Sequence, residues 1–184
     1  MLGAVKSFLA TIVVVALLVA GAWALLSSQL SSPPRVHLAT PVEQVPAAAS
    51  GGDIAMTVQH VHDGDTLFLA AADGSELKVR LLGIDTPELR PTPECFSVEA
   101  RDHLRAFVPD GSVVTVSADT EALDQYGRSL YYLWSAGGEF VNLRLVSDGY
   151  GTALNIEPNS AHAHEFAAAE ATARDSGAGL WAAC

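Results

Sequence analysis

The sequence predicts an α+β fold: a small barrel of five β-strands with about three helices, preceded by an apolar N-terminal segment and a flexible linker. Five short runs between residues 55 and 134 have the alternation or the β-branched content of strands. Three other stretches have the spacing of helices. With 184 residues, of which 49% are hydrophobic, the chain is long enough for one folded domain with its own core.

The N-terminal segment is expected to meet a membrane. Residues 8–26 run for nineteen positions without a charged side chain, about the length that crosses the hydrocarbon of a bilayer. We predict a transmembrane or signal segment at residues 1–30, with Lys6 on the cytoplasmic side and the rest of the chain outside. Two A-x-A patterns between Ala20 and Ala24 leave cleavage open. The protein is therefore expected to be single-pass in the cell membrane, or secreted if cleaved.

The remainder of the chain divides into a linker and one domain. Residues 31–52 are rich in Ser, Pro, Ala and Gly and predict a flexible linker, whereas residues 53–184 show no internal repeat and predict a single domain. The strands are predicted at residues 55–61, 66–71, 77–84, 113–117 and 130–134, and the helices at 95–107, 141–146 and 161–174. Asn159 and Ser160 are expected to cap the last helix, which stops at Gly177. Five strands with inserted and terminal helices favour a closed barrel of the OB-fold type.

The two cysteines, Cys95 and Cys184, agree with export, because thiols outside the cytoplasm tend to pair. The alternative is a pair of unrelated buried thiols. We predict a disulfide, since Cys184 is the last residue and a chain end gains most from a tether.

Acidic residues gather at both ends of the predicted hairpin. Asp65 stands just before the strand at 66–71, and Asp85 follows the strand at 77–84. Antiparallel pairing of these strands brings the two aspartates to the same rim of the barrel. Two converging carboxylates repel one another unless a cation lies between them, and oxygen ligands favour Ca²⁺, Mg²⁺ or Mn²⁺. The alternative is that each aspartate only supports a turn.

Arginines and a further carboxylate accompany these acids. Arg80 lies within the hairpin, Arg128 lies just before the fifth strand, and Glu88 follows Asp85 by three residues. A guanidinium can grip two phosphate oxygens at once. A cation, two arginines and a spare carboxylate are the groups that phosphoryl transfer requires, because charge develops on the reacting phosphate.

Four motifs in this order make residues 58–181 resemble the staphylococcal nuclease (thermonuclease) family. The motifs are Asp63-Gly64-Asp65-Thr66, Arg80-Leu81-Leu82-Gly83-Ile84-Asp85-Thr86-Pro87-Glu88, Asp124-Gln125-Tyr126-Gly127-Arg128 and Gly179-Leu180-Trp181. The resemblance implies an OB-fold barrel and a Ca²⁺ held by the Asp65 and Asp85 side chains and the Thr86 carbonyl. It also implies an endonuclease that hydrolyses DNA and RNA with low sequence specificity and leaves 3′-phosphate ends.

The same resemblance implies a role for each remaining site residue. Glu88 would orient or deprotonate the attacking water, Arg80 and Arg128 would bind the scissile phosphate, and Tyr126 would touch a neighbouring phosphate. Nucleic acid is then the expected partner, with a monomeric chain and no protein partner.

Several features depart from this pattern. Gln125 stands where a lysine would add a phosphate contact, and the region around Ile156 lacks the expected tyrosines. From Asp53 onward, 20 acidic residues face 8 basic ones, a net charge of −12, although proteins that bind polyanions usually show a basic face. A catalytically weak or inactive binding module on the same barrel is therefore the alternative. His60 and His62 are interpreted as surface polar positions.

Overall fold

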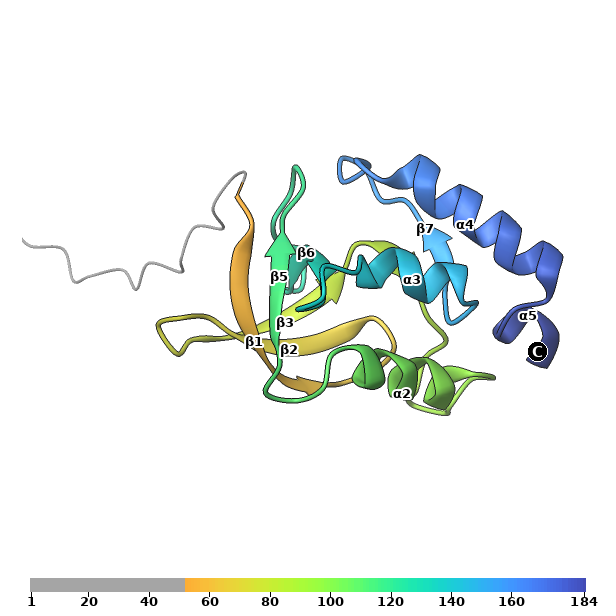
Figure 1. Cartoon of the computed structure of the whole chain (residues 1–184), viewed down its shortest axis with the longest axis horizontal. Coiled ribbons are helices and arrows are strands. Elements are labelled where there is room, and N and C mark those ends of the chain that lie inside the picture. The colour runs from red at the N-terminus through yellow and green to blue at the C-terminus, as the bar shows by residue number, and fades with distance from the viewer. Residues whose placement is uncertain (1–51) are drawn as a thin grey trace, which may run out of the picture. The chain divides into compact units, whose positions relative to one another are not determined.

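The computed structural model describes residues 52–184. Five strands form a closed barrel in the order β1-β2-β3-β6-β5, which confirms the predicted α+β barrel (Figure 1). These strands are β1 (Ile54–Val61), β2 (Thr66–Ala70), β3 (Glu76–Leu81), β5 (Val113–Ser117) and β6 (Ser129–Trp134). Because inward positions alternate along each strand, side chains such as Val58, Leu67 and Val79 fill the barrel, and all three are almost completely buried.

Barrel closure depends on β1, which pairs antiparallel with both β2 and β5. The register between β1 and β2 shifts between Val58 and His60, a bulge of the kind that increases strand curvature. On the other side β3 pairs with β6 in parallel, so the barrel has no free edge among these strands. This arrangement fixes the rim that carries the predicted acids.

The run predicted as one strand at residues 77–84 is in fact two strands. β3 ends at Leu81, and β4 (Gly83–Asp85) leaves the barrel to pair with the short β7 (Thr152–Leu154). Gly83 allows this change of direction with a φ of 79° and leaves room for Phe166, whose ring would collide with any Cβ there. The change of partner carries Asp85 to the rim of the barrel.

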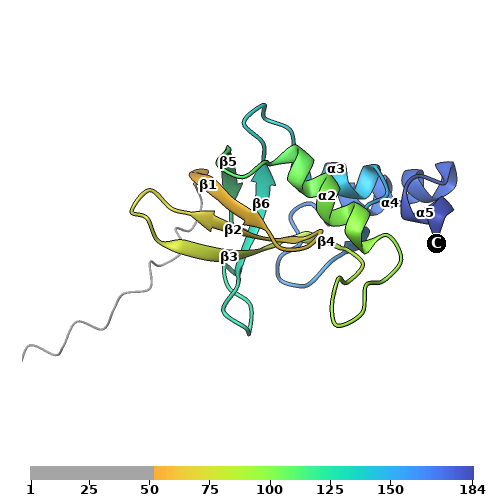
Figure 2. The ribbon, with the colours of Figure 1, turned by 90° about the horizontal axis from the view of Figure 1, so that it is seen from below.

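The helices are α2 (Ser97–Phe107), α3 (Val141–Ser147), α4 (Ala163–Ser176) and the single turn α5 (Leu180–Ala183). In two perpendicular views α4 and α5 lie beyond the barrel on the side away from the β2–β3 turn (Figures 1 and 2). Asn142 of α3 is completely buried, where it accepts a hydrogen bond from the Leu133 N–H and donates one to the Leu82 carbonyl. This side chain therefore ties the helix to the barrel at the point where β3 gives way to β4.

The predicted cap of the last helix is wrong. α4 begins after His162, and Asn159 instead exchanges two hydrogen bonds with the backbone of Glu121, at 2.7 and 2.9 Å. The long-range contact therefore replaces the local cap and joins the segment before α4 to the loop that precedes β6.

The predicted disulfide between Cys95 and Cys184 is present, with the two Cα atoms 6.0 Å apart. It attaches the end of the chain to the segment just before α2. Within residues 52–184, no helix has the length and hydropathy needed to span a membrane. The apolar run at residues 8–26 and the predicted linker lie outside the described residues.

Candidate active site

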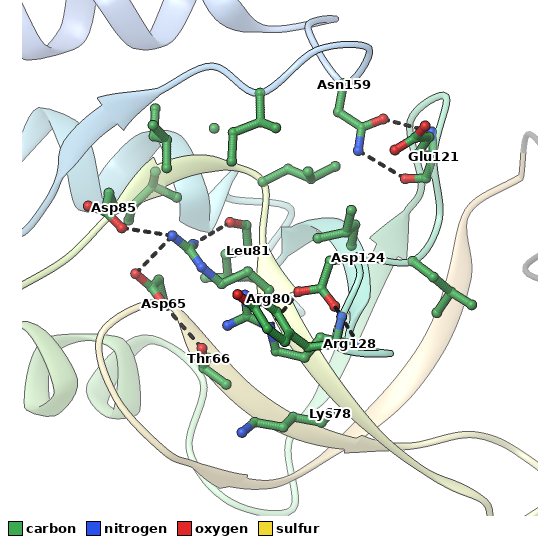
Figure 3. A pocket seen from close by; sticks show the side chains of 18 of the residues that line it. Asp65, Thr66, Lys78, Arg80, Leu81, Asp85, Glu121, Asp124, Arg128 and Asn159 are labelled. Carbon is green, nitrogen blue, oxygen red and sulfur yellow. Dashed lines mark hydrogen bonds and ion pairs between the residues drawn. The ribbon is translucent and has the colours of Figure 1, made fainter. Parts of the chain in front are cut away.

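A pocket of about 620 Å³ opens at the rim of the barrel (Figure 3). It lies among the β1–β2 turn, β3, the segment after β4 and the loop that precedes β6. Its lining includes the following predicted site residues: Asp65, Arg80, Asp85, Glu88, Tyr126 and Arg128. Thr86, the other predicted site residue, is buried beside Asp65. The structure therefore brings together residues that span more than sixty positions of the sequence.

Asp65 is the most deeply buried acid of the pocket, with 6% of its surface exposed. One carboxylate oxygen, Oδ2, accepts hydrogen bonds from the backbone N–H and the hydroxyl of Thr86, both at 2.9 Å. The other oxygen, Oδ1, accepts the hydroxyl of Thr66 at 3.1 Å. Gly64 permits this packing, since a Cβ there would lie only 2.7 Å from the Thr86 hydroxyl. The turn thus holds the Asp65 carboxylate firmly against the segment that follows β4.

Arg80 lies between the two aspartates. Its Nη2 is 3.3 Å from Asp65 Oδ2 and 3.0 Å from Asp85 Oδ1, and its Nη1 donates to the Leu81 carbonyl at 2.7 Å (Figure 3). The Arg80 side chain is only 12% exposed, whereas that of Asp85 is 54% exposed. A shared contact with one guanidinium nitrogen shows that the two carboxylates converge, as the hairpin predicted.

The electrostatics of Asp65 favour a further cation. Burial raises the pKa of Asp65 to about 6, the positive charge of Arg80 opposes this rise, and the negative charge of Asp63 adds to it. Because Asp65 and Asp85 share one guanidinium, the three ionised side chains together carry a net negative charge. Residues 52–184 contain no group of three or more His, Cys, Asp or Glu side chains arranged around a metal. A set of two carboxylates and the Thr86 carbonyl nevertheless fits a hard cation, because all its donors are oxygen atoms.

Arg128 is positioned by Asp124, a role that the sequence analysis missed. Asp124 Oδ2 accepts the Arg128 Nε–H at 2.6 Å, and Oδ1 accepts the backbone N–H groups of Tyr126 and Arg128. The contact through Nε leaves the terminal nitrogens of Arg128 for another anion. The sequence does place Asp124 four residues before Arg128, in a Tyr-Gly-Arg turn. An aspartate at that position is equally typical of an ordinary turn, so its role could not be recognised.

Removing the charge of Asp124 should destabilise the fold in a pH-dependent way. Partial burial alone would raise the pKa of Asp124, but the hydrogen bonds from Arg128 and Tyr126 outweigh it and hold the pKa below its usual 3.8. The ionised Asp124 carboxylate therefore stabilises the folded state above pH 3.8, and this contribution is lost as the pH falls and the carboxylate is protonated. We expect Asp124→Asn to lower Tm by roughly 5 °C at pH 7 and by much less near pH 3, measured by calorimetry. The exposed Asp110→Asn is the control, and an equal loss for both variants would contradict the assignment.

Glu88 and Tyr126 extend into the pocket with more freedom. The Glu88 backbone is fixed by Glu94, whose side chain accepts the Glu88 N–H and whose own N–H bonds to the Glu88 carbonyl, both at 2.9 Å. The Glu88 carboxylate makes no hydrogen bond or ion pair among residues 52–184. Tyr126 is 76% exposed, with the Arg128 guanidinium 5.8 Å from the centre of its ring.

Two aliphatic side chains add an apolar part to the pocket. Leu123 and Ile156 are 47% and 62% exposed and line the pocket beside the polar Glu121, Glu157 and Asn159. Ile156 therefore lies in the region where the resemblance leads one to expect tyrosines.

The barrel fits the OB-fold, and carboxylates and arginines converge in a pocket at its rim. Comparison with known proteins gives the family. The sequence model of the staphylococcal nuclease homologue family matches residues 78–183, and the chain belongs to this family.

Relatives with assigned names include two thermonucleases. The Thermonuclease of Staphylococcus intermedius is 31% identical over 131 residues, which cover 67% of this chain and 74% of that protein. The Thermonuclease of Staphylococcus hyicus is 32% identical over 127 residues, 67% of this chain and 73% of that protein. Endonuclease YhcR of Bacillus subtilis (strain 168) is 34% identical over 151 residues, 76% of this chain. This chain spans only 12% of the length of Endonuclease YhcR.

Proposed function

We propose that this protein is a metal-dependent nuclease that hydrolyses phosphodiester bonds of DNA and RNA with low sequence specificity. The observation that carries the proposal is the convergence of Asp65 and Asp85 on Arg80 in a pocket that also contains Glu88 and Arg128. The names of the relatives, thermonuclease and endonuclease, support the same activity. A module that only bound nucleic acid would have no evident need for the full set of Asp65, Arg80, Asp85, Glu88 and Arg128.

The ion that we propose is Ca²⁺, held by the carboxylates of Asp65 and Asp85 and the carbonyl of Thr86. When bound, it supplies positive charge that offsets the charge developing on the phosphate. Arg80 and Arg128 bind the phosphate oxygens, since a guanidinium donates two parallel hydrogen bonds to such a group. Tyr126 contacts a neighbouring phosphate from its exposed position.

Glu88 is the proposed general base. A water molecule attacks phosphorus and gives a proton to the Glu88 carboxylate, while the bond from phosphorus to the 5′ oxygen breaks. The leaving oxygen takes up a proton from solvent, and Glu88 then releases its proton to solvent, so the products are a 3′-phosphate and a 5′-hydroxyl. The free carboxylate of Glu88 and its fixed backbone suit this role, because the group can accept a proton without first losing another partner.

We propose that the domain works outside the cytoplasm. The apolar run at residues 8–26 supports a membrane segment or signal, with the linker at residues 31–52 leading to the domain at 53–184. The disulfide between Cys95 and Cys184 supports the same location, since such bonds persist in oxidising compartments. The substrate would then be extracellular or periplasmic nucleic acid, met by a monomer.

Digestion of defined substrates by the purified full chain tests the proposal. Circular plasmid DNA and a transcribed RNA should both be cleaved internally with Ca²⁺ present. The 3′ ends should block primer extension until a phosphatase removes the phosphate. Arg128→Ala, prepared in parallel, should be slower by about 10²-fold or more, which excludes a contaminating nuclease. Arg174→Ala, on α4 and away from the pocket, is the matched control. No cleavage by the wild-type protein, or equal cleavage by Arg128→Ala, would contradict the proposal.

A further inference from the structure

A row of three side chains crosses the outer face of the barrel next to the pocket. In the strand register, His60 of β1 lies opposite Phe68 of β2, and Phe68 lies opposite Lys78 of β3. The residues on either side of Phe68, Leu67 and Leu69, are completely buried, so Phe68 belongs to the outward set of its strand. We call His60, Phe68 and Lys78 the outer-face row.

The outer-face row presents aromatic rings and a cation to solvent. The ring of His60 stacks on that of Phe68, with centroids 4.4 Å apart and planes 14° apart. His62 meets the same phenylalanine edge-on at 6.3 Å, and Lys78 Nζ lies 5.8 Å from its ring centre. Both histidines and Lys78 are exposed, and Phe68 is half-buried. Phenylalanine on an outward position adds little to the core, so its stacked arrangement calls for another explanation.

The row is continuous with the proposed catalytic pocket. Lys78 and His62 both line that pocket, and Arg80 lies two residues beyond Lys78 on the same face of β3. In the parallel pairing of β3 with β6, Val79 lies opposite Ser129. Arg128 precedes Ser129 and Lys78 precedes Val79, so these two residues lie at the same level of neighbouring chain segments (Figure 3). Arg80 lies opposite Thr66, and Phe68 is two positions further along β2, a separation of about 7 Å along the strand. A strand of nucleic acid held at Arg80 would therefore pass close to Phe68.

The charge distribution points to the same path. The domain carries a net charge of −12 from Asp53 onward, which repels a polyanion. Three of its eight basic residues, Lys78, Arg80 and Arg128, nevertheless lie together on this face. Lys78 has no ion-pair partner among residues 52–184, so its charge is available to a phosphate. Arg80 and Arg128 are each paired with aspartates, so Lys78 is the cation that this face offers to a phosphate, next to the stacked rings of His60 and Phe68. Aromatic rings beside a cation are a combination that holds single-stranded nucleic acid.

We propose that the outer-face row binds the nucleotide adjacent to the scissile phosphate of a single-stranded substrate. The base packs against the His60 and Phe68 rings, and Lys78 contacts the phosphate of that nucleotide. The row requires an unpaired base, because the faces of bases in a duplex are covered by their neighbours. This inference rests on the proposed nuclease function and names the form of substrate that the site prefers. His60 and His62 are surface positions, as the sequence indicated, and the proposal adds a binding role for His60.

Binding of a labelled single-stranded DNA 12-mer, followed by fluorescence anisotropy in EDTA, tests the stacking contact. Phe68→Ala and Phe68→Leu should each bind roughly tenfold more weakly than the wild type, whereas Phe68→Trp should retain binding. Phe68→Leu keeps a large apolar side chain in the strand and removes only the aromatic ring. Its loss of binding therefore reports the missing ring and not a folding defect. A duplex of the same sequence should bind the wild type and Phe68→Leu to within about twofold, since base-paired nucleotides cannot stack there.

The salt dependence of the same binding tests the charge contact. Lys78→Ala should reduce the slope of log K against log salt by about 0.7, the value for one phosphate contact to a single strand. Phe68→Leu should weaken binding without changing the slope. Arg174→Ala, which removes an equal charge from α4, should leave both affinity and slope unchanged. Equal slopes for the wild type and Lys78→Ala would overturn this part of the proposal.

Cleavage assays separate failure of this inference from failure of the proposed function. If the wild-type protein cleaves no nucleic acid, the proposed function is wrong. If it cleaves the single-stranded 12-mer and Phe68→Leu binds and cleaves that strand equally well, the nuclease stands and the outer-face row is not part of it. The expected result is a loss of kcat/KM of roughly tenfold for Phe68→Leu on the single-stranded 12-mer, with little change on the duplex of the same sequence, whose bases cannot stack on the row.

Discussion

Glu88→Gln should lower the turnover of nucleic acid by about 10²- to 10⁴-fold while leaving substrate binding nearly unchanged. Glutamine has the shape of glutamate and can keep the backbone contacts with Glu94, but it cannot accept a proton from water. The loss should therefore appear in kcat, with KM close to the wild-type value. Initial rates on a fluorogenic single-stranded oligonucleotide, at saturating and limiting concentrations, separate the two constants.

The control for Glu88→Gln is Glu99→Gln, which removes the same charge from the exposed face of α2. The control protein should retain wild-type rates, so that a general effect of charge is excluded. A Glu88→Gln protein within threefold of wild-type kcat would mean that another group activates the water, even if the activity itself were established.

Removal of the metal should reduce cleavage to background, and Ca²⁺ should restore it. The same ion should stabilise the fold, because Asp65 and Asp85 share the single positive charge of Arg80. An ion that binds only the folded protein raises the free energy of unfolding by about 2.7 kcal/mol when its concentration is 100 times Kd. This corresponds to a rise in Tm of several degrees for a domain of this size. Differential scanning fluorimetry of chelator-treated protein, titrated with Ca²⁺, measures this rise without any substrate.

Asp65→Asn provides the matched test of the ion site. Asparagine can still accept the Thr86 N–H but brings no negative charge to the pocket. The variant should show neither the Ca²⁺-dependent rise in Tm nor cleavage, whereas Asp73→Asn, on the exposed β2–β3 turn, should behave as the wild type. A full Ca²⁺ response in Asp65→Asn would place the ion elsewhere.

The central part of the site, where Asp65 and Asp85 meet, could be predicted from the sequence because it is built on a hairpin. Strands β2 and β3 alternate clearly and are joined by a short turn, so their pairing could be read from the sequence and brought Asp65 towards Asp85. The resemblance then supplied roles for Glu88 and Arg128, and the structure brings both residues to the same pocket. Those roles remain proposals that the variants above test.

The features that sequence missed depend on contacts between distant segments. β4 and β7 are three residues each and pair Gly83 with Leu154, so neither is long enough to be recognised by periodicity. Asn159 resembles a helix cap in its local context, but its side chain is taken by Glu121, 38 residues earlier. Phe68 received no role from the sequence, because only the strand register with His60 and Lys78 reveals the surface that they share.

The bond between Cys95 and Cys184 links the shape of the catalytic segment to the redox state of its surroundings. Cys95 follows Glu88 by seven residues and Glu94 by one, and its partner is the final residue of the chain. Thiol reductants would remove this covalent link between α5 and the segment before α2, whereas the hydrogen bond from the Leu180 N–H to the Gly149 carbonyl, at 2.8 Å, would still hold α5. Under the proposed location outside the cytoplasm, this covalent restraint would form only in oxidising surroundings. The segment that carries Glu88 would then gain it after export.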